Sequence, residues 1–460
     1  MNKTHQAMGR LLSAAVILAG SMAVAEPFDA VGEFDGRLGA SGPDRGPIVA
    51  GSTAEISGRG FGPEQPVTLR QNGEDLNGGE PFTADAEGNL TATVDIPESA
   101  EPGLYPVVVE LGGDAPYATI FDLKIAKELG EIGTDRYDVS SAPSVRNPYQ
   151  VAVTEDAIYV TGAVGRPPVQ ESTLAKVDPE TLELLAEVTP SKAPAREDGS
   201  DGGVFAVYGV GVAEEAGQVW VTNTRQNTIA VYDAEDLSLI KQFDPETVGH
   251  PRDAVAHDGK VYVSATFEPR VHVFDTGTLE EVRVIELDSA RRGQNFAAAS
   301  LSVAEQAGKL FVSSLRSEEV AVVDLATDTQ TGGFAVDNSV NTIGLAATPD
   351  ATRLYTVAQG NDAVSIIDAE TGETLSQVNV GASPLNAVVE PTTGNVFIAL
   401  READAVAVIS PEGEILANLA IGSTPNHLAV DGSGGVYVVN KSGGEDDPTS
   451  NQISHITPAE

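Results

Sequence analysis

Residues able to carry acid–base chemistry are few in this sequence, and two histidines stand out by their surroundings. His250 leads a short apolar segment that continues through Arg252 and Asp253, and His427 lies inside a similar segment, directly after Asn426. An imidazole titrates near neutral pH and suits proton transfer, whereas an arginine holds anions. His427, His250, Arg252 and Asp253 are therefore the candidates for a catalytic site, if the protein is an enzyme.

Other kinds of chemistry are not supported. The chain has no cysteine, which excludes thiol catalysis, iron–sulfur clusters and cysteine-bound zinc. It has no paired histidines at metal-binding helical spacing, no Ser/His/Asp arrangement by spacing, no Walker A motif and no dinucleotide fingerprint in a strand–helix context. We therefore predict no cofactor.

Two acidic loops leave calcium binding open as an alternative. One contains Asp198 and Asp201, and the other contains Asp446 and Asp447. Carboxylates suit a hard cation such as Ca²⁺, but neither loop has EF-hand spacing. Solvated surface loops are the competing interpretation.

The net charge of −41 arises from 68 acidic and 27 basic residues. A field of this sign repels nucleic acid and anionic lipid, because both bind through clustered Lys and Arg. The acidity fits a protein kept soluble in a salty medium, or one that attracts a cationic partner or metal.

The N-terminus predicts export. Lys3 and Arg10 precede an apolar stretch too short to span a bilayer, and Ala23-Val24-Ala25 offers a cleavage site after Ala25. Residues 1–25 are thus a predicted signal peptide, with a short membrane anchor as the alternative. No later stretch reaches membrane length. We expect a periplasmic or secreted protein that does not span a membrane and is monomeric.

A Gly/Asp/Pro-rich segment, 26–45, is interpreted as a linker, and two regions with different sequence patterns follow it. Residues 46–127 contain short alternating strands separated by turn signals such as Asn72-Gly73, typical of an antiparallel β-sandwich. The turn Gly60-Phe61-Gly62-Pro63 and the run Pro102-Gly103-Leu104-Tyr105 resemble bacterial immunoglobulin-like modules. Such modules serve as spacers or interaction domains.

Residues 131–460 repeat a strand pattern at intervals of 42 to 55 residues. The clearest copies are Thr228-Ile229-Ala230-Val231-Tyr232-Asp233, Arg270-Val271-His272-Val273-Phe274-Asp275, Glu319-Val320-Ala321-Val322-Val323-Asp324, Ala363-Val364-Ser365-Ile366-Ile367-Asp368 and Ala405-Val406-Ala407-Val408-Ile409-Ser410; weaker ones end at Asp178 and Thr457. Each unit contains four strand signals, so seven units predict an all-β, seven-bladed β-propeller. The last unit lacks a fourth strand, and we expect 131–141 to complete that blade.

The second strand of each unit carries a family resemblance. Trp220-Val221-Thr222-Asn223, Tyr159-Val160-Thr161 and Tyr437-Val438-Val439-Asn440 resemble the repeat of the YVTN (YncE-like) family of exported bacterial β-propellers. The resemblance implies the fold more firmly than the function, because related propellers include binding proteins, lactonases and lyases. A lactonase or lyase is therefore the enzymatic alternative.

The innermost strands should line a central channel, where polar side chains converge on a site. Aligning these strands places Gln150, Gly209, Asp253, Ser300, Gly344, Asn386 and His427 at one level, preceded by Tyr149, Tyr208, Arg252, Ala299, Ile343, Leu385 and Asn426. Our predicted ligand-binding residues are Gln150, Tyr149, Tyr208, Arg252, Asp253, Asn386, Asn426 and His427. Simple hydration of a water-filled channel is the competing interpretation. The first hypothesis for function is a non-enzymatic binding or scaffold protein of the cell envelope that binds a small molecule, metal or protein.

Overall fold

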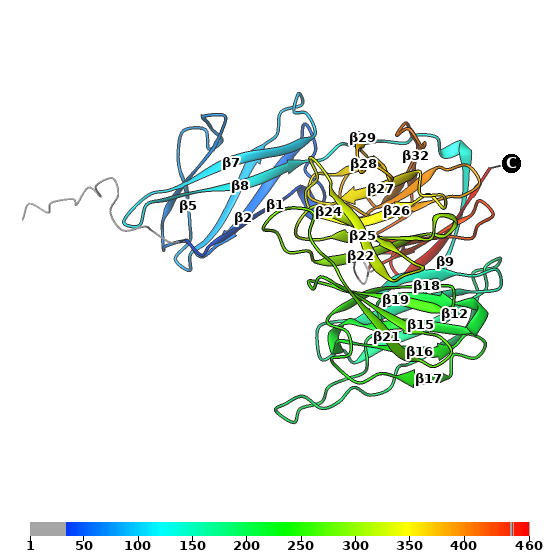
Figure 1. Cartoon of the computed structure of the whole chain (residues 1–460). Helices are drawn as coiled ribbons and strands as arrows, with labels where there is room; N and C mark the ends of the chain where they lie inside the picture. The colour runs from blue at the N-terminus through cyan, green and yellow to red at the C-terminus, as the bar shows by residue number, and fades with distance from the viewer. Residues whose placement is uncertain (1–33, 442–443, 445, 460) are drawn as a thin grey trace, which may run out of the picture.

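The computed structural model describes residues 34–441, 444 and 446–459, and it consists almost entirely of antiparallel strands (Figure 1). The all-β prediction is confirmed. Short 3₁₀ turns, such as η3 (Glu214–Ala216) and η5 (Glu305–Ala307), are the helical elements among these residues. None of the described helices is long and apolar enough to cross a bilayer. The predicted signal peptide, 1–25, lies outside the described residues.

The N-terminal part forms two sheets around one core (Figure 1). The strands alternate buried and exposed residues, as in β6 (Asn89–Asp95), where Leu90, Ala92 and Val94 point inward. This alternation explains why the region folds as two facing sheets. The first sheet contains β1 (Arg37–Ser41), β2 (Thr53–Arg59) and β6 (Asn89–Asp95), and the second contains β3 (Pro66–Gln71), β4 (Glu74–Asp75), β5 (Phe82–Thr83), β7 (Gly103–Leu111) and β8 (Tyr117–Ile125).

The interpretation of 26–45 as a linker is wrong for its described part. β1 pairs antiparallel with β2 along its whole length, placing Ala40 opposite Ile56. Phe34, Leu38 and Ala40 pack against the core of the two sheets. The Gly, Asp and Pro content of this segment concealed three apolar residues that are enough to anchor an edge strand.

The remainder of the described chain contains seven four-stranded sheets, called sheets 1 to 7 below in chain order. Their strands are β10 (Pro148–Val153), β11 (Ile158–Val164), β12 (Glu171–Val177) and β13 (Leu184–Val188) in sheet 1; β14 (Val210–Ala213), β15 (Gln218–Asn223), β16 (Thr228–Asp233) and β17 (Leu239–Gln242) in sheet 2; β18 (Pro251–His257), β19 (Lys260–Ala265), β20 (Arg270–Asp275) and β21 (Glu280–Glu286) in sheet 3; β22 (Ala298–Ala304), β23 (Lys309–Ser314), β24 (Glu319–Asp324) and β25 (Thr329–Ala335) in sheet 4; β26 (Thr342–Ala347), β27 (Arg353–Ala358), β28 (Ala363–Asp368) and β29 (Thr374–Asn379) in sheet 5; β30 (Pro384–Val389), β31 (Val396–Leu400), β32 (Ala405–Ile409) and β33 (Ile415–Ala420) in sheet 6; and β34 (Pro425–Val430), β35 (Val436–Asn440), β36 (Gln452–Pro458) and β9 (Tyr137–Pro143) in sheet 7.

These sheets form a closed ring. The first strand of each sheet lies beside the first strand of the next, and β34 of sheet 7 lies beside β10 of sheet 1. The fourth strand of sheet 7 is β9, which pairs antiparallel with β36 and places Val139 opposite Ile456. Both ends of the repeat region therefore belong to one sheet, and pairing between them closes the ring.

The hydrophobic core is divided among the spaces between successive sheets. The largest side chain, Trp220 of β15, is fully buried and packs against Phe243 and Phe274 at centroid distances of 6.0 and 5.7 Å. Aromatic and β-branched residues at this strand position thus join each sheet to the next one. The first strands face the axis instead, and they position the polar residues described below.

The N-terminal sheets contact the ring beside sheets 5 and 6. Lys124 Nζ of β8 donates to Asp362 Oδ1 at 2.8 Å and to the Gln359 carbonyl at 3.2 Å. Asp362 is buried, and burial raises its pKa while the Lys124 charge opposes that rise. Because a buried carboxylate needs a partner, Lys124 fixes the two parts at this contact.

Candidate functional site

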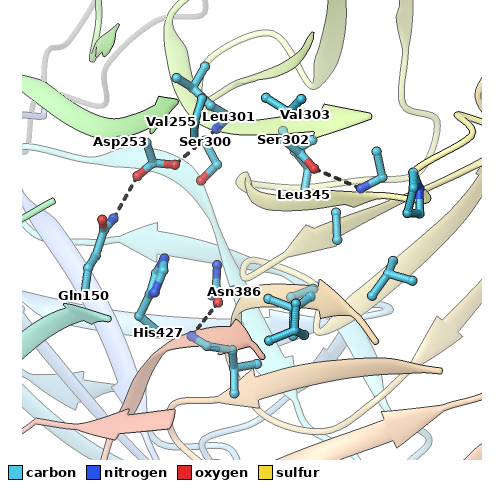
Figure 2. Close-up of a pocket in the computed structure, with 18 of the residues that line it drawn as sticks. Gln150, Asp253, Val255, Ser300, Leu301, Ser302, Val303, Leu345, Asn386 and His427 are labelled. Atoms are coloured by element: carbon cyan, nitrogen blue, oxygen red, sulfur yellow. Dashed lines mark hydrogen bonds between the residues drawn. The ribbon is translucent and has the colours of Figure 1, made fainter. Parts of the chain in front are cut away.

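A cavity of about 320 Å³ lies inside the ring, and the first strands of the sheets line it (Figure 2). Its polar lining includes Gln150, Asp253, Ser300, Asn386 and His427, which occupy the same level of five different sheets, and also Ser302 and Glu305 farther along the chain in sheet 4 and the turn after β22. Gly209 and Gly344 occupy that level in the other two. Most other lining residues farther along the same strands, including Val255, Leu301, Val303 and Leu345, are apolar.

The polar row joins neighbouring sheets. Each of four side chains accepts a hydrogen bond from a backbone N–H in the next sheet. The donor is the residue directly after that sheet's own row position. The bonds are Val210 N to Gln150 Oε1 at 3.0 Å, Leu301 N to Asp253 Oδ2 at 3.1 Å, Leu428 N to Asn386 Oδ1 at 2.8 Å, and Val151 N to His427 Nδ1 at 3.4 Å. A first strand has no ladder partner on its axial edge, so these side chains satisfy N–H groups that would otherwise be unpaired.

Hydroxyl groups of the second strands make a further set of bridges. Thr222 Oγ1 accepts from Gly209 N at 2.8 Å within its own sheet and donates to the Arg252 carbonyl of the next sheet at 3.1 Å. Ser313 does the same between Ser300 N and the Ile343 carbonyl. The Thr of the Val-Thr-Asn pattern is therefore a structural residue that holds adjacent sheets together.

His427 faces the cavity as a hydrogen-bond donor. Its Nδ1 accepts the Val151 N–H, so the neutral ring carries its proton on Nε2. Burial lowers its pKa to about 4, with the Arg252 charge adding to the decrease and Asp253 opposing it. At neutral pH the ring is uncharged, and no basic nitrogen is free to take a proton in this tautomer.

The remaining predicted residues lie at the opposite, starting end of the first strands and do not line the cavity. The Tyr149 and Tyr208 rings meet edge to face at a centroid distance of 5.0 Å. Asn426 Nδ2 donates to the Tyr149 carbonyl at 2.6 Å. The His250 ring lies 5.3 Å from the Phe267 ring. The predicted site is thus divided into a cavity group and a group at the starting end.

Arg252 connects the two groups. Its Nε lies 3.5 Å from Asp253 Oδ1, yet this buried nitrogen has no hydrogen-bond partner among the described residues. The Arg252 charge also acts on both histidines, lowering the pKa of His250, after burial and Arg225, and that of His427.

Sequence reasoning missed several cations beside the tyrosines. Lys441 Nζ lies 4.2 Å from the Tyr149 ring centroid, and the Arg225 guanidinium lies 5.9 Å from that of Tyr208. Arg401 is close enough to lower the pKa of Lys441. One signal was available, because Arg401 and Lys441 directly follow a second strand and Arg225 comes two residues after one. We call the group of Tyr149, Tyr208, Arg225, Arg401 and Lys441 the cationic mouth, and Arg252 lies next to it on the cavity side.

The carboxylates of the acidic loops accept hydrogen bonds within their own loops, and Asp447 also accepts one from the Ser423 hydroxyl. Asp198 Oδ1 accepts from Ser200 N at 2.9 Å, Asp201 Oδ1 from Gly203 N at 2.9 Å, and Asp447 Oδ1 from Thr449 N at 2.8 Å. The described residues contain no cluster of three or more His, Cys, Asp or Glu that could hold a metal ion. Asp446 belongs to the same loop as Asp447, and calcium binding there stays a prediction.

Comparisons with known proteins establish the fold class. No family model matches the chain. Protein NirF of Pseudomonas aeruginosa is 23% identical over 253 residues, which cover 51% of this chain and 60% of NirF, so the chain spans less than two thirds of that protein.

Solved structures resemble the ring over most of their own length. Virginiamycin B lyase from Staphylococcus aureus superposes with a TM-score of 0.55 at 12% identity, covering 70% of this chain and 99% of the lyase. Hydrazine synthase of Kuenenia stuttgartiensis gives 0.55 at 15% identity, covering 68% and 96%. The WD40 β-propeller domain of Doa1 gives 0.52 at 12% identity, covering 71% and 96%. The predicted β-propeller is confirmed, and at these identities the likeness concerns the fold alone.

Proposed function

We propose that this chain is an exported, non-enzymatic binding protein of the cell envelope, which holds its ligand at a mouth of the propeller channel. In this proposal the signal peptide of residues 1–25 is removed, and an immunoglobulin-like sandwich precedes a seven-bladed, YVTN-like propeller. Seven four-stranded sheets, and first strands that adjoin one another around the ring, support the blade count. The single core shared by two N-terminal sheets supports the sandwich.

The observation that carries the binding role is the buried Nε of Arg252, which lacks a hydrogen-bond partner among the described residues. The Arg252 side chain as a whole is 19% exposed. An unpaired buried donor costs about 1–3 kcal/mol, which a ligand acceptor would recover. Arg252 lies between the cavity and the cationic mouth, so such a ligand would enter along the channel axis.

The enzymatic alternative has less support from the site. His427 would serve as the general base of a lactonase or lyase, but its Nδ1 is engaged by the Val151 N–H. The other hydrogen bonds of the row hold sheets together, and none of them orients a nucleophile. Likeness to virginiamycin B lyase at 12% identity concerns the fold and brings no catalytic residue to this chain.

A thermal-shift screen of the mature chain against small metabolites tests the proposal. We expect at least one compound to raise the Tm of the wild type and to raise it less in Arg252→Gln. Arg283→Gln is the matched control, because Arg283 is exposed on the outer strand β21 and its loss changes the net charge equally. Turnover of the bound compound that disappears in His427→Ala would replace the binding role with the enzymatic one.

A further inference from the structure

We propose that the cationic mouth binds a compact, multiply charged oxyanion, such as a small di- or tricarboxylate or a phosphate ester. This inference rests on the proposed binding function and names the ligand class of that same site. The relevant chemistry is shared by carboxylate and phosphate oxygens, which both accept hydrogen bonds from guanidinium and ammonium groups.

Two cations of the mouth, Lys441 and Arg225, are held in place before any ligand arrives. Lys441 packs over the Tyr149 ring, Arg225 over the Tyr208 ring, and the two rings pack edge to face. Cation–π contacts of this kind restrict long side chains that would otherwise lose freedom on binding. The mouth is therefore preorganised for a charged group.

Their charges are also unpaired. Among the residues that the structure describes, no ion pair includes Arg225, Arg401 or Lys441. The nearby carboxylate of Glu402, next to Arg401, lies instead 3.7 Å from Lys124. Burial lowers the pKa of Lys441, and with the Arg401 and Arg225 charges acting in the same direction it falls to about 8. The chain has 68 acidic residues and only 27 basic ones, so a group of adjacent unpaired cations is unusual in it. These like charges repel one another, and a bound anion would offset that repulsion.

The ligand must be small. Outside the mouth the molecule is strongly acidic, so an extended polyanion such as nucleic acid would meet repulsion beyond the first few contacts. Flat stacking is not available on the covered faces of Tyr149 and Tyr208, because Lys441 and Arg225 occupy them. The mouth thus offers positive charge and hydrogen-bond donors, which favours a small ligand that carries several charged oxygens.

Arg252 supplies a deeper contact for such a ligand. Its unpartnered Nε lies toward Asp253 and the cavity, whereas Lys441 and Arg225 contact the two tyrosines at the mouth. An anion with two separated acidic groups could engage Arg252 with one and the outer cations with the other.

The test is calorimetric titration of the mature chain with citrate and, separately, pyrophosphate, with glycerol as the neutral probe. The variants are Lys441→Gln and Arg225→Gln, and Arg283→Gln is the equal-charge control. We expect at least one anion to bind the wild type, each mouth variant to raise Kd about tenfold, and the control to change it less than about twofold. Binding of citrate alone or of pyrophosphate alone would identify the carboxylate or the phosphate branch.

Three results would overturn the inference, and they separate it from the broader proposal. If Arg283→Gln weakened anion binding as much as the mouth variants do, binding would depend on the overall charge of the protein. Unchanged affinity in both mouth variants would place the anion elsewhere. Failure of both anions, while an uncharged compound binds in an Arg252-dependent way, would refute the ligand class and leave the binding function standing. Both variants keep a polar side chain, and their Tm values would show whether folding is retained.

Discussion

Gln150 Nε2 of sheet 1 donates a 2.8 Å hydrogen bond to Asp253 Oδ1 of sheet 3, across the intervening sheet 2. The contact is possible because the row residue of sheet 2 is Gly209, which has no side chain to separate them. Asp253 also accepts from Leu301 N of sheet 4 through its other oxygen. One carboxylate therefore links three sheets around the channel.

We predict that Gln150 and Asp253 are energetically coupled. The single variants Gln150→Ala and Asp253→Ala should each destabilise the fold, because each leaves buried polar groups unpaired. In a double-mutant cycle measured by chemical denaturation, the coupling energy should be about 1–2 kcal/mol. Asp138, exposed on β9, provides the control, and Asp138→Ala combined with Gln150→Ala should be additive. Additivity at Gln150 and Asp253 would contradict the proposed link.

Gly209 should not tolerate alanine. A Cβ at this position would lie 1.9 Å from the Arg252 carbonyl oxygen, a backbone atom that cannot rotate away. We expect Gly209→Ala to lower the free energy of unfolding by about 2–3 kcal/mol, because the adjacent first strands would have to separate. The control is Gly332→Ala on the outer strand β25, where a Cβ would meet no atom within 4 Å. Equal stability of the two variants would show that the strands have room to move.

The sequence contained enough information to align the first strands but not to show what their side chains do. Repeat spacing placed Gln150, Asp253, Asn386 and His427 at one level, and all four line the cavity. Their bonds to the next sheet could not be foreseen, because these bonds depend on how closely neighbouring sheets approach at the axis. The polar row therefore suggested a ligand site where the structure shows largely structural hydrogen bonds.

The cationic mouth was missed for a related reason. Arg225, Arg401 and Lys441 lie in turns after the second strands, where unit length varies and alignment by strand pattern fails. Their proximity to Tyr149 and Tyr208 depends on ring closure, which brings sheets 6, 7, 1 and 2 together. Similarly, β9 begins at Tyr137 rather than within 131–136, because Thr134–Arg136 forms a 3₁₀ turn, η2, before the strand.

His427 should make stability depend on pH below neutrality. Its folded pKa of about 4 lies below the ordinary value of 6.5, so the unfolded chain binds more protons between these two values. The contribution of His427 to the free energy of unfolding is fully present above about pH 6.5. It decreases by up to about 3 kcal/mol as pH falls toward 4. His427→Gln should flatten this part of the stability profile, measured by urea denaturation at several pH values.

Ser300→Ala is the control for that profile, since Ser300 lines the same cavity without titrating in this range. The burial of His250 and His455 lowers their pKa values as well, so part of the slope should remain in His427→Gln. A profile identical to that of the wild type would show that His427 is not held neutral. NMR titration of the imidazole would give the pKa directly.

Lys441 should make anion binding depend on pH above neutrality. Its pKa of about 8 means that the free protein loses this charge as pH rises from 7 to 9. Because the pKa of His250 is lowered, mainly by burial, its ring is neutral throughout this range. We expect the affinity for citrate or pyrophosphate to fall about tenfold over this interval, since a neutral amine cannot offset the ligand charge. Lys441→Arg should bind at pH 9 as it does at pH 7, because arginine does not titrate there.

A bound anion raises the pKa of Lys441, so wild-type binding at pH 8 should also take up protons. This uptake is measurable by calorimetry in buffers of different ionisation enthalpy. If Lys441→Arg loses affinity as steeply as the wild type, another group must be the titrating one.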